Sequence, residues 1–132
     1  MLDPAPHLKA AFATDSRNWV DADLAWSRHL MVYDVTLGGS DLLHARDYRT
    51  GDAADQLAAK LRVLGGCGVL FSTGLSDQTA LTLSQAGIFP VVLEQRRPIS
   101  AVLSRLQTLM RRDPPLWMCR VLRYGAPLHD PL

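Results

Sequence analysis

The stretch DAADQLAAKLRVLGGCGVLFS, from Asp52 to Ser72, decides the fold because the spacing of its apolar residues changes within it. Its first half has the period of a helix, and Gly65 and Gly66 follow where a left-handed helix end forms most easily. Residues 68–72 are then a short apolar run, typical of a buried strand. The stretch predicts a helix that leads directly into a strand, with a helical stripe made of Ala54, Leu57, Ala58 and Leu61.

The same alternation continues toward the C-terminus. Ser76 and Gly87 are suitable start and stop signals for a helix between them, and residues 89–93 form the next expected strand. A longer helix follows, and the Pro-Pro pair at 114–115 ends it before a short helix over 116–123. In the longer helix the apolar residues recur at i, i+3, i+4, i+7 and i+11, namely Ile99, Val102, Leu103, Leu106 and Met110.

Three strands are expected on the N-terminal side, over residues 8–14, 29–35 and 42–48. The second has apolar residues on both faces, which favours a central position, and the third has the mixed composition of an edge strand. The order β-β-β-α-β-α-β-α predicts an α/β fold with a five-stranded mixed sheet, in which three antiparallel strands precede two that join through right-handed crossovers. Because helices then cover both faces, we expect a three-layer α/β/α sandwich.

Length and composition narrow the class of protein. A chain of 132 residues that is 48% hydrophobic predicts one domain over 1–132, with its core at about 8–123. The 14 Lys and Arg residues balance 13 Asp and Glu residues, which argues against a nucleic-acid partner. Neither a signal-peptide pattern nor an apolar run of ~18 residues occurs, so we expect a cytoplasmic protein without a membrane partner. Cys67 and Cys119 lack metal or redox spacing and are expected to be free thiols.

Several short pieces of the chain occur in an order and spacing that resemble the dinitrogenase iron-molybdenum cofactor biosynthesis family. In that family one piece usually reads Val-Asp-x-His-Phe-Gly-x-(Ala/Ser)-Arg, and here Asp23-Leu24-Ala25 replaces His-Phe-Gly. The resemblance covers roughly residues 8–123 and implies a ribonuclease H-like fold. Its carriers are Ala11 to Thr14, Val20 to Arg28, Leu30 to Tyr33, Asp55 to Leu61, Gly66-Cys67, Gln85 to Pro90 and Pro114 to Trp117.

This resemblance implies a nitrogenase accessory protein of nitrogen fixation, one that transiently binds or escorts the iron-molybdenum cofactor or its iron-sulfur precursor. A permanent cluster site uses about four cysteine thiolates, and two cysteines are too few for one. The alternative is an interaction module that docks on a nitrogenase component or a cofactor-assembly protein without touching metal. In either case we expect no enzyme activity, and a monomer or weak dimer.

Cys67, Arg28 and His29 are the candidate contacts to such a cargo. Cys67 is the first candidate metal ligand, and a small buried apolar residue is the competing interpretation. The resemblance places Arg28 on the family arginine, where it would face an anionic cluster, although a salt bridge to Asp21 or Asp23 is the competing interpretation. His29 is either a ligand or a structural histidine.

Two further candidates lie between a strand and a helix. The turn from Gly74 to Ser76 could bind an anion at the start of the helix, whereas simple capping by Ser76 explains the same residues. Asp23 is a hard oxygen ligand and a poor substitute for imidazole beside an anionic cluster. Trp19 and Trp26 flank this region as possible partner anchors or as residues packed on the sheet edge.

Overall fold

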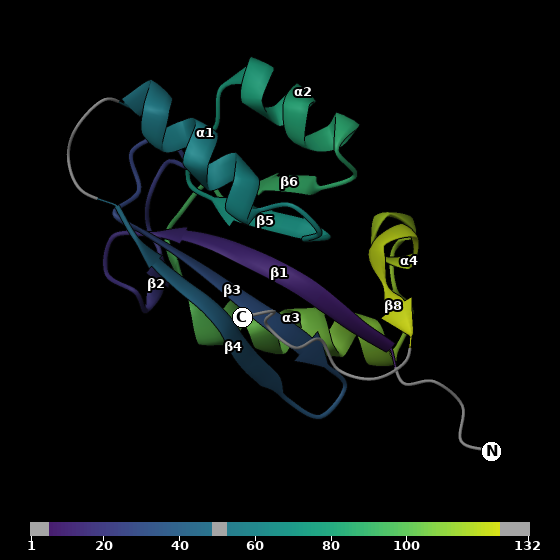
Figure 1. The fold of residues 1–132 in the computed structure, drawn as a ribbon. Helices are drawn as coiled ribbons and strands as arrows, with labels where there is room; N and C mark the ends of the chain where they lie inside the picture. The colour runs from purple at the N-terminus through teal and green to yellow at the C-terminus, as the bar shows by residue number, and fades with distance from the viewer. Residues whose placement is uncertain (1–5, 49–52, 125–132) are drawn as a thin grey trace.

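The structure is a computed structural model and describes residues 6–48 and 53–124. Its main sheet has the strand order β4-β3-β1-β5-β6 (Figure 1), and these strands are β1 Pro6–Thr14, β3 His29–Thr36, β4 Ser40–Asp47, β5 Val69–Ser72 and β6 Phe89–Val92. The first three pair antiparallel in chain order, whereas β1, β5 and β6 are parallel neighbours. The predicted mixed α/β sheet is confirmed, with β4 at one edge of this path.

Helices cover both faces of the sheet (Figure 1). On one side lie α1 and α2, and on the other lies α3, while α4 lies beside the end of the sheet where β1 begins. These helices are α1 Ala53–Val63, α2 Asp77–Gln85, α3 Ile99–Arg111 and α4 Leu116–Val121. Each corresponds to a predicted helix, although α4 ends two residues earlier than expected. The predicted start of the first helix at Asp52 lies outside the described residues.

Two hydrophobic clusters occupy the two sides of the sheet, because alternate residues of a strand point to opposite faces. One cluster packs between the sheet and α3, and it contains all five residues of the stripe predicted for that helix. The other packs beneath α1 and α2, and its buried members are Ala11, Ala13, Leu24, Leu30, Val32, Leu64, Cys67, Leu70, Leu83 and Ile88. The segment that contains Leu24 is therefore anchored in the second cluster.

Local signals fix the helix ends. The Ser76 side chain accepts a hydrogen bond from the Thr79 N–H at 3.2 Å, which confirms its capping role. Gly66 and Gly87 follow α1 and α2 with φ angles of 85° and 81°, a region that L side chains rarely adopt. These turns lead the chain directly from each helix into the next strand.

One prediction of the strand count was wrong. The main sheet has six strands rather than five, because β8 (Arg123–Tyr124) pairs antiparallel with the start of β1. A separate two-stranded ribbon joins β2 (Trp19–Val20) to β7 (Arg97–Pro98) and was not expected. Among the described residues, no helix has the length and apolarity needed to cross a membrane.

Candidate functional site

The segment from Asp23 to Arg28 lies where β1 and β5 end and β3 begins. An isolated parallel bridge joins Asp23 to Gly74, so two candidates that are far apart in the sequence are in contact. The Leu24 N–H donates to the Gly74 carbonyl at 3.2 Å, and the Thr73 N–H donates to Ala22 at 3.0 Å. The turn after β5 thus uses its backbone groups to hold the segment.

The Asp23 carboxylate has a structural role at this contact. Its Oδ1 accepts the Ala25 N–H at 2.8 Å, which closes a tight turn of the kind aspartate favours. Its Oδ2 packs so closely on Gly74 that a Cβ built on that glycine would lie 2.7 Å away. Glycine is therefore required at position 74 for the close approach rather than for its backbone angles.

Replacing Gly74 with alanine is expected to lower the free energy of unfolding by ~1–3 kcal/mol, because the new methyl group would displace the Asp23 side chain or the backbone beneath it. Chemical denaturation of Gly74→Ala measures this loss. In an Asp23→Ala background the same substitution should cost clearly less, since the Oδ2 atom is gone. Equal losses in both backgrounds would contradict the proposed contact.

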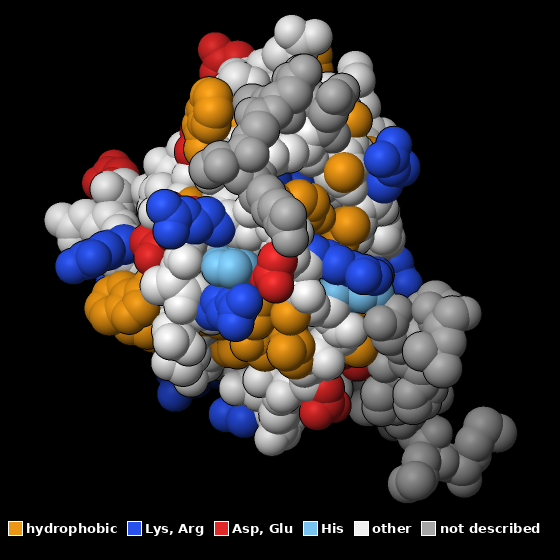
Figure 2. Space-filling model, turned by 60° about the vertical axis from the view of Figure 1, so that its left-hand side comes forward, with side chains coloured by type: hydrophobic (Ala, Val, Ile, Leu, Met, Phe, Trp, Pro, Cys, Tyr) orange, Lys and Arg blue, Asp and Glu red, His pale blue; other side chains and the backbone are white. Residues whose placement is uncertain are grey.

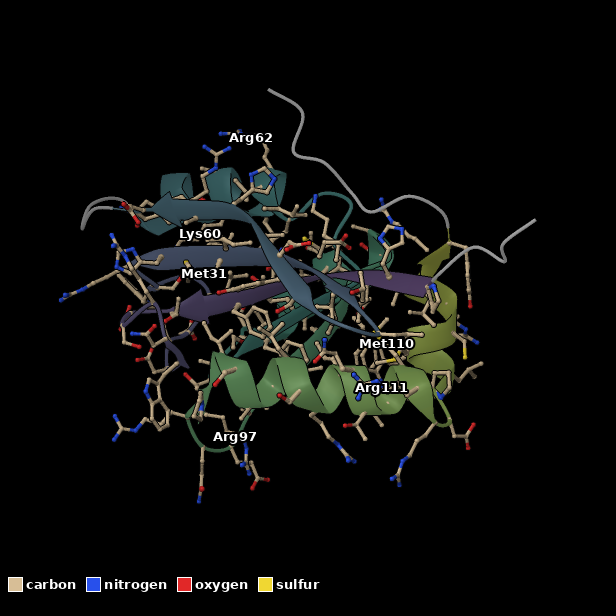
Figure 3. All side chains as sticks on the ribbon, turned by 90° about the horizontal axis from the view of Figure 1, so that it is seen from below. Met31, Lys60, Arg62, Arg97, Met110 and Arg111 are labelled. Atoms are coloured by element: carbon tan, nitrogen blue, oxygen red, sulfur yellow. The ribbon has the colours of Figure 1, made fainter. Side chains whose placement is uncertain are left out.

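A buried lysine, which the sequence reading missed, fixes the rest of the segment. Lys60 is fully buried, and its Nζ donates to the carbonyls of Leu24 at 2.9 Å, Ala25 at 3.2 Å and Ser27 at 2.8 Å. In Figure 3, Lys60 lies between α1 and the sheet, whereas Arg62 lies on the outer side of the same helix. Burial lowers the pKa of Lys60 below its usual value.

The signal for Lys60 was present in the helical pattern. Leu57, Lys60, Leu61 and Leu64 follow the i, i+3, i+4, i+7 spacing, so the lysine occupies a position where the stripe requires an apolar residue. A single cation at such a position indicates that hydrogen-bond acceptors surround its buried ammonium group. Here those acceptors are three carbonyls of the segment from Asp23 to Arg28. Ala54 of the predicted stripe lies outside the described side chains.

Arg28 is exposed and is held through its backbone. Its N–H donates to Asp15 Oδ1 at 2.9 Å, and its carbonyl accepts the Tyr48 N–H at 2.7 Å. The expected alternative, a salt bridge to Asp21 or Asp23, does not occur among the ion pairs of the described residues. The Arg28 guanidinium therefore faces solvent from a fixed backbone.

His29 lies beside Arg28 and is oriented by a carboxylate. Its Nδ1 lies 2.7 Å from Asp47 Oδ1, and Arg17 pairs with the same carboxylate at 3.4 Å. The hydrogen bond from His29 lowers the pKa of Asp47. Because a carboxylate accepts, Nδ1 carries a proton in this contact, and in the neutral ring Nε2 is then the nitrogen with the lone pair. This is the arrangement in which a histidine can act as a metal ligand.

The two tryptophans differ in their surroundings. The Trp26 side chain is 73% exposed, whereas Trp19 is 39% exposed and its ring lies 5.4 Å from the Arg96 guanidinium. Trp26 is therefore not packed on the sheet edge.

Figure 2 shows basic, acidic and histidine side chains interspersed on one face of the molecule, so this face carries no electrostatic field of a single sign.

Cys67 lies at the other end of the sheet from these residues. It precedes β5, whereas Gly74 follows it, and at about 3.3 Å of rise per residue the chain between them spans roughly 20 Å. The thiol is buried, and burial raises its pKa to about 11. The structure thus brings Asp23 into contact with Gly74, and Arg28 and His29 follow on the same stretch of chain, whereas Cys67 lies at the opposite end of β5. Cys119 is an exposed free thiol.

The two thiols should differ strongly in reactivity. The Cys67 pKa of about 11 stands against an ordinary value of 9.0, which lowers its thiolate fraction near neutral pH by ~100-fold. A maleimide is therefore expected to label Cys119 first, as peptide mass spectrometry would show. Equal labelling rates for both thiols would refute the assignment.

The folded state favours the neutral Cys67 thiol, so this contribution to the free energy of unfolding is present below pH 9 and is lost as the pH rises toward 11.

Metal chemistry at this site is limited by the donor set. Within residues 6–48 and 53–124, no three His, Cys, Asp or Glu side chains gather in a way that could hold a metal ion. The segment offers one exposed guanidinium and one exposed indole, and His29, the first residue of β3, adds one oriented imidazole. Such a set suits reversible contact with a large anionic group.

Comparison with known proteins places this geometry in context. A family model described as dinitrogenase iron-molybdenum cofactor matches residues 7–109. Protein NifX of Rhodobacter capsulatus is 27% identical over 130 residues, covering 90% of this chain and 82% of that protein. Protein NifX of Sinorhizobium fredii is 29% identical over 124 residues, covering 87% and 78%. The crystal structure of PH0822 superposes with a TM-score of 0.62 at 15% identity, over 76% of this chain and 89% of that one, and this likeness concerns the fold alone.

Proposed function

This chain belongs to the dinitrogenase iron-molybdenum cofactor family, and from that premise we propose that it is an accessory protein of nitrogenase maturation that transiently binds or escorts the iron-molybdenum cofactor or its iron-sulfur precursor. It would act as a carrier without catalysing a reaction. The relatives named above, both called NifX, support an accessory role in cofactor biosynthesis.

The observation that carries this proposal is the rigid presentation of the segment from Asp23 to Arg28. Lys60 holds its carbonyls from one side, and Gly74 holds its start from another. Binding a cargo reversibly without a permanent site requires groups that are already in position, because ordering a mobile loop would cost affinity. The segment satisfies this requirement while leaving Arg28 exposed.

We assign the cargo contacts to Arg28 and His29. The guanidinium supplies forked donors for an anionic group, and Nε2 of His29 supplies one imidazole ligand for iron or molybdenum. Asp47 fixes the ring, as carboxylates commonly do for metal-binding histidines. Cys67 remains the second candidate ligand, but its raised pKa and its position before β5 make it the weaker one.

The alternative function is docking without metal contact. Trp26, with most of its indole exposed, supports this version, because aromatic anchors dominate many protein interfaces. The partner would be a nitrogenase component or a cofactor-assembly protein. In both versions we propose a cytoplasmic, single-domain protein, monomeric or weakly dimeric, and the strand order of its main sheet supports a ribonuclease H-like architecture.

One anaerobic experiment separates the two functions. Isolated iron-molybdenum cofactor is titrated into the wild type and into His29→Gln, Arg28→Gln, Cys67→Ser and Cys119→Ser, with uptake followed on native gels. The carrier function predicts that His29→Gln and Arg28→Gln weaken uptake by ~10-fold or more, while Cys119→Ser does not. A larger loss in Cys67→Ser would move the ligand to that thiol.

Docking predicts a different pattern. Cofactor uptake would stay at background in all variants, and Trp26→Ala would abolish co-purification with a nitrogenase component. Since most of the Trp26 side chain is exposed to solvent, this substitution should not disturb folding. Background uptake together with unchanged co-purification would refute both functions.

A further inference from the structure

A groove runs along α4, far from the segment that carries Arg28. Its first part has a volume of about 410 Å³ and lies between α4 and the turn from α2 into β6. Its second part, of about 250 Å³, lies beside the turn that contains Cys67. The two parts share Gly87, Arg120 and Val121, so they form one continuous depression, which we call the α4 groove.

The first part of the α4 groove is apolar. The rings of Phe89 and Trp117 are stacked with centroids 4.8 Å apart and planes 9° apart. Leu116 lies beside them with 68% of its surface exposed, so it adds an apolar side chain that the fold itself does not bury. Apolar walls with a few polar groups are the usual composition of a small-molecule site.

Positive charge marks the second part. Arg120 and Arg123 line it, and none of its described lining residues is acidic. Lys9 lies close by, since a Cβ built on Gly66 would be 3.8 Å from its Nζ and 3.5 Å from Arg123 Nη2. None of these three cations takes part in an ion pair with another described residue. Among the described residues, Arg120 and Arg123 therefore place positive charge without a paired carboxylate on the part of the groove near the Cys67 turn.

The arginines are suited to an anionic group. Arg123 Nη2 donates to the Gly66 carbonyl at 2.6 Å, which fixes the guanidinium and leaves its other N–H groups for a ligand. The Cys67 thiol also lines this part, and with its raised pKa it is neutral near pH 7 and does not repel an anion. A carboxylate between Arg120 and Arg123 would face donors without a competing negative charge.

Pairing with another strand is a poor explanation for this surface. In the described part of the chain β6 ends the sheet path, but Pro90 has no N–H to donate at that edge. The Phe89 and Leu93 N–H groups bond to the neighbouring strand and are already used. Extension of the sheet would thus lack one backbone donor at this edge, which favours an occupant that contacts the side chains of the groove.

We propose that the α4 groove binds a small organic acid with an apolar body, its carboxylate held by Arg120 and Arg123 and its apolar part packed on the Phe89–Trp117 pair. This site is separate from the contacts assigned to Arg28 and His29, and it stands whether or not the chain carries a metal cluster.

The test is an NMR titration of the ¹⁵N-labelled full chain with 3-phenylpropionate. Saturable shifts are expected for the amide signals of Gly66, Gly87 and Val121. Two matched probes test the two parts of this ligand separately, since 3-phenylpropanol lacks the charge and propionate lacks the ring. Each should bind at least ~10-fold more weakly, because a hydrogen bond to a charged group or a buried ring contributes about that factor.

Variants locate the binding. Arg120→Gln should weaken binding of 3-phenylpropionate by ~10-fold without affecting folding, because its exposed guanidinium makes no hydrogen bond or ion pair with another described residue. Trp117→Ala should remove the contribution of the ring. Arg105→Gln, on the exposed side of α3, is the control and should bind normally. Absence of saturable shifts at the highest soluble concentration, equal binding of the uncharged probe, or an equal loss in Arg105→Gln would each overturn the proposal.

Discussion

Replacing Lys60 with methionine is expected to lower the free energy of unfolding by about 3 kcal/mol, the largest single effect on stability that we predict. The substitution keeps the volume but removes three hydrogen bonds, and it leaves the partly buried carbonyl of Ala25 and the buried carbonyl of Ser27 without their donor. Relief of the buried charge offsets part of this loss. For a chain of 132 residues, the midpoint of thermal unfolding should fall by roughly 10 °C.

Arg62→Met is the matched control for this prediction. Arg62 lies on the same helix, two residues further on, with an exposed side chain (Figure 3), so its replacement should change stability by less than ~0.5 kcal/mol. Thermal unfolding followed by circular dichroism measures both variants. Similar midpoints for Lys60→Met and Arg62→Met would show that the lysine does not hold the segment.

We also expect that Lys60→Arg does not recover the stability lost in Lys60→Met, because a planar guanidinium does not fit three carbonyls arranged around an ammonium.

The sequence predicted α3 most directly because its apolar period is undisturbed. The stripe from Ile99 to Met110 has no polar interruption, and all five of its residues are buried. The strands β2, β7 and β8 have two residues each, too few to show any period. Their pairing follows from the positions of neighbouring elements, so the sixth strand of the sheet could not be found from spacing alone.

The candidate site was harder to predict for a different physical reason. Asp23 and Gly74 were both identified as candidates, but their contact depends on which strands become neighbours in space. Cys67 was grouped with Arg28 on chemistry, although β5 places them at different ends of the sheet. Lys60 was overlooked because an isolated lysine on a helix is usually solvated. Residue type indicated what each group can do, and only topology determined which groups act together.

Replacing Asp23 with histidine should strengthen binding of the isolated iron-molybdenum cofactor by ~10–100-fold, the largest effect on function that we predict. The family motif has histidine at this position, and a neutral imidazole would replace a carboxylate that repels an anionic cargo. The exchange also removes the 2.8 Å hydrogen bond from Ala25 to Asp23 Oδ1, at a cost of about 1 kcal/mol in stability. Lys60 should still hold the following carbonyls, so the segment keeps its position.

Asp23→Asn separates the two causes of the expected gain. Its side-chain oxygen can still accept from Ala25, and it removes the charge without adding a ligand. If repulsion dominates, Asp23→Asn should bind the cofactor nearly as well as Asp23→His in an anaerobic titration. If ligation dominates, only the histidine variant should gain affinity, and combining it with His29→Gln should show whether the two imidazoles bind the same cargo. Unchanged affinity in both variants would mean that the cargo does not approach Asp23, and the contact surface would then have to exclude the start of this segment.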